Sequence, residues 1–335
     1  MSSEISSHES FALELVTIRD FFRFATSRFN AAGVVYGHGT TNALDEAAFI
    51  VLEALHLPVD RLDPFLDARL TLAERERLLA LIAARIETRK PAAYLLGRAY
   101  VGGVPFYVDE RVIVPRSYIG ELLRGDFLTS VMGEGLDEAS RILDLCTGSG
   151  CLAVLAATAY PGASVDAVDL SADALDVARR NVDESGYGDR IRLLGGDLFA
   201  PLGAERYNLI LTNPPYVDAE AMADLPPEYR QEPALALAGG EDGLDVVRRI
   251  IAEAAAHLED NGGLVCEIGR GRGRLEADFP NLPFVWLDTE DSSGEVFWLT
   301  AKALRSARPE LSVRGDRRHR GPRQNRPRRV RQSRP

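Results

Sequence analysis

The fold is decided by the stretch Ile142–Gly150, which reads ILDLCTGSG. A short apolar strand leads into a loop with two glycines, and the small-residue run Cys151–Ala159 then has the composition of a helix. Glycines let the backbone approach a ligand closely, and a helix N-terminus behind the loop presents free N–H groups. The stretch therefore predicts a strand, a ligand-binding loop and a helix, the first unit of an α/β sheet.

Strands and helices continue to alternate after this unit. Further strands are expected at Val165–Asp169, Arg190–Leu194, Asn208–Thr212 and Gly263–Ile268, with two closing strands at Phe284–Leu287 and Val296–Ala301. Intervening helices are expected at Ala172–Ser185, capped by Ser171, and at Gly243–Leu258. This alternation predicts a doubly wound, parallel, Rossmann-like sheet whose ligands bind at the carboxyl ends of the strands.

The fourth of these strands runs directly into Asn213-Pro214-Pro215-Tyr216. Prolines lack an N–H and push the preceding residue towards extended geometry, so the stretch cannot extend a ladder or a helix. The side-chain oxygen of Asn213 and the carbonyl of Pro214 can accept both hydrogens of one –NH2 group, and Tyr216 can lie against a planar amide or base. The motif predicts a pocket for an amino group. A Pro-Pro turn with a buried tyrosine is the alternative.

Aspartates at three strand ends distinguish between cofactors. The glycine loop, with Asp169 about 20 residues after it, also fits a dinucleotide. S-adenosylmethionine (SAM) has no pyrophosphate and carries a sulfonium cation, which Asp144 would suit. Asp169 would accept from the ribose hydroxyls and Asp197 from the adenine amino group, although each aspartate alone could be a cap or turn residue.

A nicotinamide dehydrogenase would give no role to residues 213–216, so SAM is the expected cofactor and no metal is expected. Leu198 and Phe199 would pack on the adenine ring. The expected cofactor-binding residues are Asp144, Cys146, Thr147, Gly148, Ser149, Gly150, Asp169, Asp197, Leu198, Phe199 and Asn213.

N-terminal to the sheet, amphipathic helices are expected at Phe11–Asn30, Asp45–His56 and Leu72–Arg89. They predict a small helical domain over residues 1–90, either a scaffold or a docking site for a macromolecular substrate. β-forming residues over 91–115, with a polar break at 109–111, predict a β-hairpin connector.

The sheet domain is expected to span residues 116–304 and to begin with a helix at Ile119–Val131. Arg116 and Ser117 would cap that helix, or Arg116 would reach the active site. Residues 305–335 are rich in Arg, Pro and Gly, which predicts a disordered tail.

Charge is unevenly distributed along the 335 residues. Residues 303–335 carry 12 arginines and two acidic residues, a net of +10, whereas residues 1–302 carry 27 basic and 48 acidic residues, a net of −21. An acidic body repels polyanions and attracts basic partners, so nucleic acid is not an expected partner except through the tail. The tail itself is either a dispensable extension or a weak tether to ribosomal RNA.

Cysteine usage and hydropathy indicate the compartment. The three cysteines lack paired metal-ligand spacing, the first ten residues do not resemble a signal peptide, and no apolar run reaches the roughly 20 residues of a membrane helix. We expect a cytoplasmic protein without a membrane partner.

With these motifs in place, the chain resembles the class I, SAM-dependent glutamine methyltransferases that modify translation proteins. The resemblance runs from about residue 27 to residue 303 and includes the segments 142–150, 196–199, 213–216 and 241–243 together with Asp169. Within the group the chain is most similar to the branch that acts on ribosomal protein three of the large subunit, through segments 105–117, 225–230 and 287–292. It departs from the branch's pattern at Tyr118, Gly120 and Gln231.

The resemblance implies methyl transfer from SAM to the side-chain amide of a glutamine. Asn213, Pro214 and Tyr216 would be catalytic, and Asn213, Pro214, Pro215 and Tyr216 would bind the substrate. The release-factor branch, an adenine-amino DNA or RNA methyltransferase, and a non-catalytic ribosome-assembly factor are the alternatives. An intact motif set disfavours the last, and the acidic body disfavours a nucleic-acid substrate.

Overall fold

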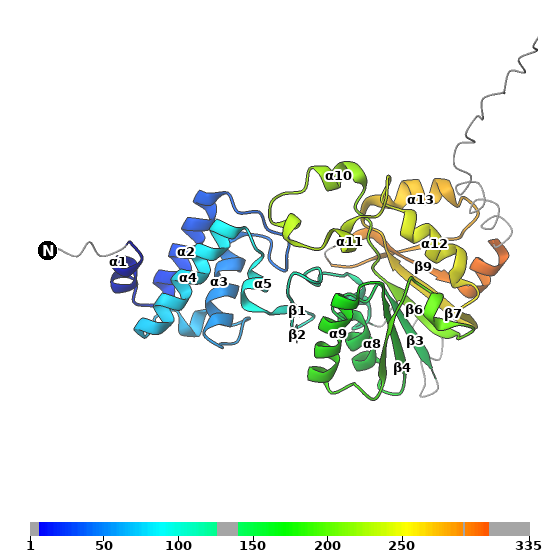
Figure 1. Ribbon diagram of the computed structural model, residues 1–335, viewed down its shortest axis with the longest axis horizontal. Coiled ribbons are helices and arrows are strands. Elements are labelled where there is room, and N and C mark those ends of the chain that lie inside the picture. The colour runs from blue at the N-terminus through cyan, green and yellow to red at the C-terminus, as the bar shows by residue number, and fades with distance from the viewer. Residues whose placement is uncertain (1–6, 126–139, 291, 308–335) are drawn as a thin grey trace, which may run out of the picture.

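The structure is a computed structural model that describes residues 7–125, 140–290 and 292–307. A group of helices formed by the N-terminal third of the chain lies beside a larger α/β part, and the residues between them run along the junction (Figure 1). The expected α/β class is confirmed.

A seven-stranded sheet forms the centre of the α/β part, in the order β5-β4-β3-β6-β7-β9-β8. The first five strands in this order are parallel, and β9 pairs antiparallel with both β7 and β8. The bounds are β3 Arg141–Leu145, β4 Ser164–Asp169, β5 Ile191–Gly195, β6 Tyr207–Thr212, β7 Leu258–Glu267, β8 Val285–Asp288 and β9 Ser293–Thr300. All seven predicted strands are confirmed. Of the two closing strands, β9 runs against the parallel set, and β8, which is antiparallel to β9, runs in the same direction as the parallel strands.

Helices cover both faces of the sheet, because buried strand residues alternate between two cores. Leu209 and Leu211 of β6 pack in one core with α8, whereas Ile210 packs in the other with α12. The helices of this part are α8 Cys151–Ala159, α9 Ala172–Ser185, α12 Asp245–Ala254 and α13 Arg272–Asp278. The first two have the predicted bounds, and Ser171 caps α9 as expected. The predicted helix over 243–258 is shorter, because residue 258 already begins β7.

The N-terminal helices have a core of their own. They are α1 Ser7–Glu14, α2 Ile18–Ala32, α3 Ala43–Ala54, η1 Asp63–Phe65, α4 Leu72–Thr88 and α5 Ala92–Leu96. The single helix predicted over 11–30 is wrong. Thr17 starts a new helix there, since its hydroxyl accepts from the Asp20 N–H and the Asp20 carboxylate accepts from the Thr17 N–H.

A hairpin connects the two parts, but its turn is not where the polar break suggested. Strands β1 Ala99–Val101 and β2 Val104–Phe106 are joined by Gly102 and Gly103, both at positive φ. Residues 109–111 follow the hairpin, where the Asp109 carboxylate binds Arg111. The next helix, α6 Ile119–Leu122, has its predicted start but ends at Leu122, so the predicted continuation is wrong over residues 123–125, and residues 126–131 lie outside the described residues.

The remaining elements follow the strand ends. They are η2 Ala200–Leu202, α10 Ala219–Ala223, η3 Tyr229–Gln231, α11 Ala234–Leu237 and η4 Gly269–Gly271. Residues 301–307 are helical, with Leu304 fully buried, so the ordered chain continues past the predicted tail boundary at 305. The tail beyond 307 lies outside the described residues. In the part that the structure describes, no helix combines the length and apolarity needed to span a membrane.

Candidate active site

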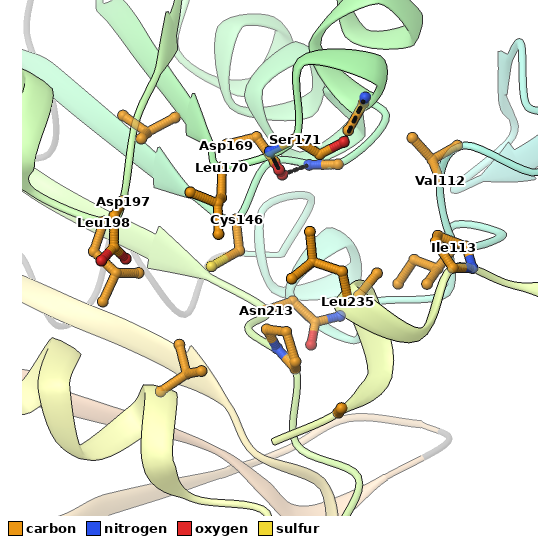
Figure 2. A pocket seen from close by; sticks show the side chains of 18 of the residues that line it. Val112, Ile113, Cys146, Asp169, Leu170, Ser171, Asp197, Leu198, Asn213 and Leu235 are labelled. Carbon is orange, nitrogen blue, oxygen red and sulfur yellow. Dashed lines mark hydrogen bonds between the residues drawn. The ribbon is translucent and has the colours of Figure 1, made fainter. Parts of the chain in front are cut away.

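One cavity lies at the carboxyl ends of β3, β4, β5 and β6, where the topology predicts a ligand site. It encloses about 930 Å³, open solvent at its mouth included. Seven of the sequence-predicted residues line it: Cys146, Gly148, Asp169, Asp197, Leu198, Asn213 and Pro215. The glycine loop and the asparagine of the amino-binding motif therefore share one cavity, as expected (Figure 2).

The glycine loop is built around left-handed backbone. Gly148 and Gly150 have φ of 55° and 79°, and Cys146 adopts a φ of 58° without being glycine. A Cβ on Gly150 would lie 3.2 Å from the Ala178 Cβ, so α8 packs closely on α9 there. Cys146 lines the cavity, and burial, followed by the charges of Asp169 and Asp144, raises the pKa of its thiol well above the usual range.

Asp169 joins the loop to the next strand. Its Oδ2 accepts from the Gly148 N–H at 2.8 Å and its Oδ1 from the Ser171 N–H at 2.8 Å (Figure 2). Burial raises the pKa of this carboxyl although both backbone donors lower it. Each oxygen keeps a second lone pair for a ligand, so Asp169 can both fix the loop and accept from a hydroxyl.

Asp144 does not line the cavity. It is fully buried, and its Oδ2 accepts from Thr147 Oγ1 at 2.5 Å and from the Ala153 N–H at 3.1 Å. Burial raises its pKa to about 7. The expected direct contact with a sulfonium is therefore replaced by a positioning role, in which Asp144 holds the loop against the start of α8.

The loop after β5 presents only part of its predicted set. Asp197 and Leu198 line the cavity, and the Asp197 Oδ2 accepts from Arg249 Nη2 at 2.7 Å. Phe199 instead lies in the core, where it stacks on His257 with ring centroids 4.7 Å apart. The expectation that Phe199 packs on a cofactor ring is thus wrong. Leu170, exposed at the cavity wall beside Asp169, is the apolar side chain that the sequence reasoning missed.

The amino-binding motif is divided between cavity and interior. Asn213 and Pro215 line the cavity, whereas Pro214 is buried and Tyr216 turns away. Tyr216 donates to Glu267 Oε1 at 3.2 Å, and its ring lies so close to Gly269 that a Cβ there would come within 2.8 Å. Tyr216 does not line the cavity, so the predicted contact between Tyr216 and a planar amide is wrong. Tyr216 instead supports the motif from behind.

Glu267, at the end of β7, was missed by the sequence reasoning. Its fully buried carboxylate also accepts from Ser117 Oγ at 2.7 Å and from the Tyr118 N–H at 3.0 Å. The sequence could have indicated Glu267 through its position, since it lies near the end of a predicted strand, at the same edge of the sheet as the other site residues. Arg116 neither caps α6 nor lines the cavity, but pairs with Glu232.

The three departures from the family pattern do not line the cavity. A Cβ on Gly120 would lie 2.9 Å from the Val101 Cγ1, so glycine allows α6 to pack on the hairpin. Tyr118 contributes its backbone N–H to Glu267, and Gln231 donates to the Pro227 carbonyl at 3.5 Å. These three residues therefore lie outside the cavity in which the predicted methyl transfer would take place.

Glu267 and Asp144 predict how stability depends on pH. Burial raises the pKa of Glu267 from 4.5 to about 7 and that of Asp144 from 3.8 to about 7, so the folded state binds more protons than the unfolded state between these values. The free energy of unfolding is therefore expected to fall as pH rises from about 4.5 towards 7. Glu267→Gln should remove one contribution, on the order of 3 kcal/mol. Urea unfolding of both proteins across this range checks it, with exposed Glu220→Gln as control. An unchanged pH dependence in Glu267→Gln contradicts the assignment.

Comparison with known proteins agrees with this geometry. The family model "Methyltransferase small domain" matches residues 124–225. Proteins named ribosomal protein uL3 glutamine methyltransferase are similar over most of the chain. The one from Bradyrhizobium diazoefficiens is 60% identical over 295 residues, covering 87% of this chain and 92% of its own. Those from Bordetella pertussis and Neisseria meningitidis serogroup B are 56% and 54% identical, covering 87% and 88% of this chain and 97% and 96% of their own.

Coverage of this extent includes the helical part, the connector and the sheet, not the methyltransferase core alone. The resemblance inferred from the sequence motifs is confirmed. This chain belongs to the family of ribosomal protein uL3 glutamine methyltransferases, a SAM-dependent family.

Proposed function

We propose that this protein transfers a methyl group from SAM to the side-chain amide nitrogen of a glutamine in ribosomal protein uL3. The observation that carries the proposal is that Asn213 and the Gly148–Asp169 pair line the same cavity. A donor bound at the loop and an amide held at Asn213 would therefore meet inside one enclosed space.

The residues present fit SAM. Asp169 offers free lone pairs beside a loop that approaches closely, which suits ribose hydroxyls. Leu170 and Leu198 supply apolar surface for the adenine ring, and Asp197 can accept from its amino group while it stays paired with Arg249. Thr147, Ser149 and Gly150 shape the loop from outside the cavity. When bound, SAM supplies a methyl group attached to a positively charged sulfur.

The chain's own part in the reaction is orientation. A carboxamide nitrogen is a poor nucleophile because its lone pair is delocalised into the carbonyl. The Asn213 side-chain oxygen and the Pro214 carbonyl would accept both amide hydrogens and point the nitrogen at the methyl group. Positioning of this kind supplies up to roughly 7–11 kcal/mol, and oxygen dipoles aimed at the hydrogens stabilise the charge that develops on nitrogen.

The proton that the nitrogen loses needs no protein base. The protonated, methylated amide is acidic enough for water to take its proton, and no histidine is among the described residues that line the cavity. Pro215 would complete the wall on which the amide lies, and Tyr216, held by Glu267, would fix the motif from behind.

The substrate class rests on the relatives and on charge. The relatives are named for ribosomal protein uL3. The net charge of −21 over residues 1–302 favours a basic protein over a nucleic acid. We further propose that the helical domain, residues 1–90, docks the substrate protein, and that the reaction takes place in the cytoplasm, where ribosomal proteins are made. A release factor remains the second candidate substrate.

One experiment tests the function. The purified protein is incubated with isotope-labelled SAM and, separately, with unmethylated uL3 and unmethylated release factor, and the methylated peptide is mapped by mass spectrometry. Methylation of one glutamine in uL3 is the expected result. Methylation of release factor alone would move the protein to the other branch, and SAM binding without transfer to either would indicate a binding protein.

The tail gives a prediction about where the chain can be cut. Leu304 is fully buried, and Arg305 donates to Asp260 at 2.7 Å and to the Leu258 carbonyl at 2.6 Å. Ending the chain after Ala303 should therefore lower Tm, whereas ending it after Ala307 should leave Tm unchanged. Ending the chain after Ala307 also tests whether the tail tethers RNA. Weaker RNA binding with a smaller salt dependence would support a tether, and unchanged binding would make the tail a dispensable extension. Equal Tm values for both truncations would contradict the first expectation.

A further inference from the structure

Besides the proposed cofactor-binding residues, two segments that are far apart in the sequence line the cavity and form two of its walls. One is Arg111–Ile113, directly after the hairpin, and the other is the run from Pro233 to Ala238 around α11. In Figure 2, Val112, Ile113 and Leu235 lie on the other side of Asn213 from Asp197 and Leu198. The side chain that is to be methylated would have to enter between these two walls.

A single carboxylate bridges the two walls. Glu232 immediately precedes Pro233, and its Oε1 accepts from the Val114 N–H at 2.9 Å, one residue after Ile113. The same carboxylate binds Arg116 through both oxygens, at 2.6 and 2.7 Å, and Arg116 donates in turn to the Val114 carbonyl at 2.9 Å. The Glu232 side chain is 0% exposed. We call this arrangement the Glu232 bridge.

The geometry points to Glu232 as a positioning residue for the substrate end of the active site, which sets the separation of the two walls between which the glutamine side chain enters. This inference rests on the proposed function. The Glu232 carboxylate is buried and pairs with Arg116 through both oxygens, and bidentate pairing of this kind fixes geometry more narrowly than apolar packing. Misplacement of a reacting group by about 1 Å costs roughly 10²-fold in rate, so a loosened bridge should be visible in turnover.

Glu228 supplies a matched control. It lies four residues earlier on the same segment and is equally buried, and it accepts from the Val35 N–H at 3.1 Å and from Arg89 at 3.3 Å. Its carboxylate also lies 3.8 Å from Arg85 Nη1. These partners belong to the helical domain, and none of them lines the cavity. Glu228→Gln therefore removes a comparable buried charge and leaves the bridge in place.

The test compares Glu232→Gln with Glu228→Gln in the full-length protein. Measured are kcat and KM with unmethylated uL3, the Kd for SAM by calorimetry, and Tm. We expect Glu232→Gln to lower kcat/KM at least about tenfold while the SAM Kd changes less than about threefold. Glu228→Gln should lower Tm as much as Glu232→Gln does, but its kcat/KM should stay within about threefold of the wild-type value. Equal losses of kcat/KM in both variants, or parallel loss of SAM affinity, would overturn the inference.

Hydrogen–deuterium exchange tests the bridge independently of turnover. Exchange in both 111–116 and 233–238 should rise in Glu232→Gln and stay at the wild-type level in Glu228→Gln. This holds even if the wild-type protein transfers no methyl group to uL3, a result that would refute the proposed function and not the bridge. If Glu232→Gln does not fold, the pair Arg116→Met with Glu232→Leu, which removes both charges of the Arg116–Glu232 pair together, takes its place. Unchanged exchange in these segments would refute the bridge.

Discussion

Asn213→Ala should reduce methyl transfer by at least roughly 10²–10³-fold, the cost of removing one preorganised polar partner of a transition state. The change removes an acceptor for the amide hydrogens, so the nitrogen is no longer directed and its developing charge is no longer stabilised. Because the Gly148 and Asp169 contacts are made without Asn213, the Kd for SAM should stay within about threefold.

Single-turnover assays with saturating SAM and unmethylated uL3 measure the first effect, and calorimetry measures the second. Asn213→Asp is the informative companion, because it keeps the shape and an acceptor but adds a charge. We expect it to retain more activity than Asn213→Ala. Normal methylation by Asn213→Ala would remove the amide-binding motif from the mechanism.

Asp169→Ala should have the opposite profile, with SAM affinity lost first. A hydrogen bond to a charged group contributes about 1.5–3 kcal/mol, so the Kd for SAM should rise roughly 10–100-fold. The N–H groups of Gly148 and Ser171 also lose their partner, which loosens the loop. At SAM concentrations far above the new Kd, kcat should recover most of its wild-type value, since Asn213 is untouched.

The measurement is a titration of kcat against SAM concentration. Asp169→Asn separates the two roles of the carboxylate, because its amide can satisfy only one of the two backbone donors. An unchanged SAM Kd in Asp169→Ala would place the ribose elsewhere.

Local signals explain what the sequence could predict. Helices α8 and α9 have their predicted bounds because a glycine loop and the Ser171 cap mark their starts. The Thr17–Asp20 capping box and the Gly102-Gly103 turn are equally local signals, and they place a helix start and a hairpin turn where the predicted elements had none. The doubly wound architecture also followed from simple alternation, since parallel strands with buried faces require helices on both sides.

The sequence predicts which strand ends form the site, but not which side chains at those ends face the cavity. Leu198 and Phe199 are adjacent and apolar, and only tertiary packing, which includes the stack on His257, separates the Phe199 that turns inward from the Leu198 that lines the cavity. Asp144 and Asp169 both end strands, yet one is sealed under the loop and the other faces the cavity. The carboxylates of Glu232 and Glu267 find partners more than 100 residues away, at Arg116 and Ser117 just before α6, in a segment whose position no local pattern encodes.

The thiol of Cys146 shares its cavity with the proposed methyl donor. A thiolate is a far stronger nucleophile than a carboxamide nitrogen, and an ionised cysteine there would capture the methyl group itself. Burial and two neighbouring aspartates hold the proton on that sulfur. The acidic surroundings of the loop are therefore expected to keep Cys146 from being methylated, and a positive charge placed beside Cys146 should favour its thiolate and make the cysteine itself a methyl acceptor.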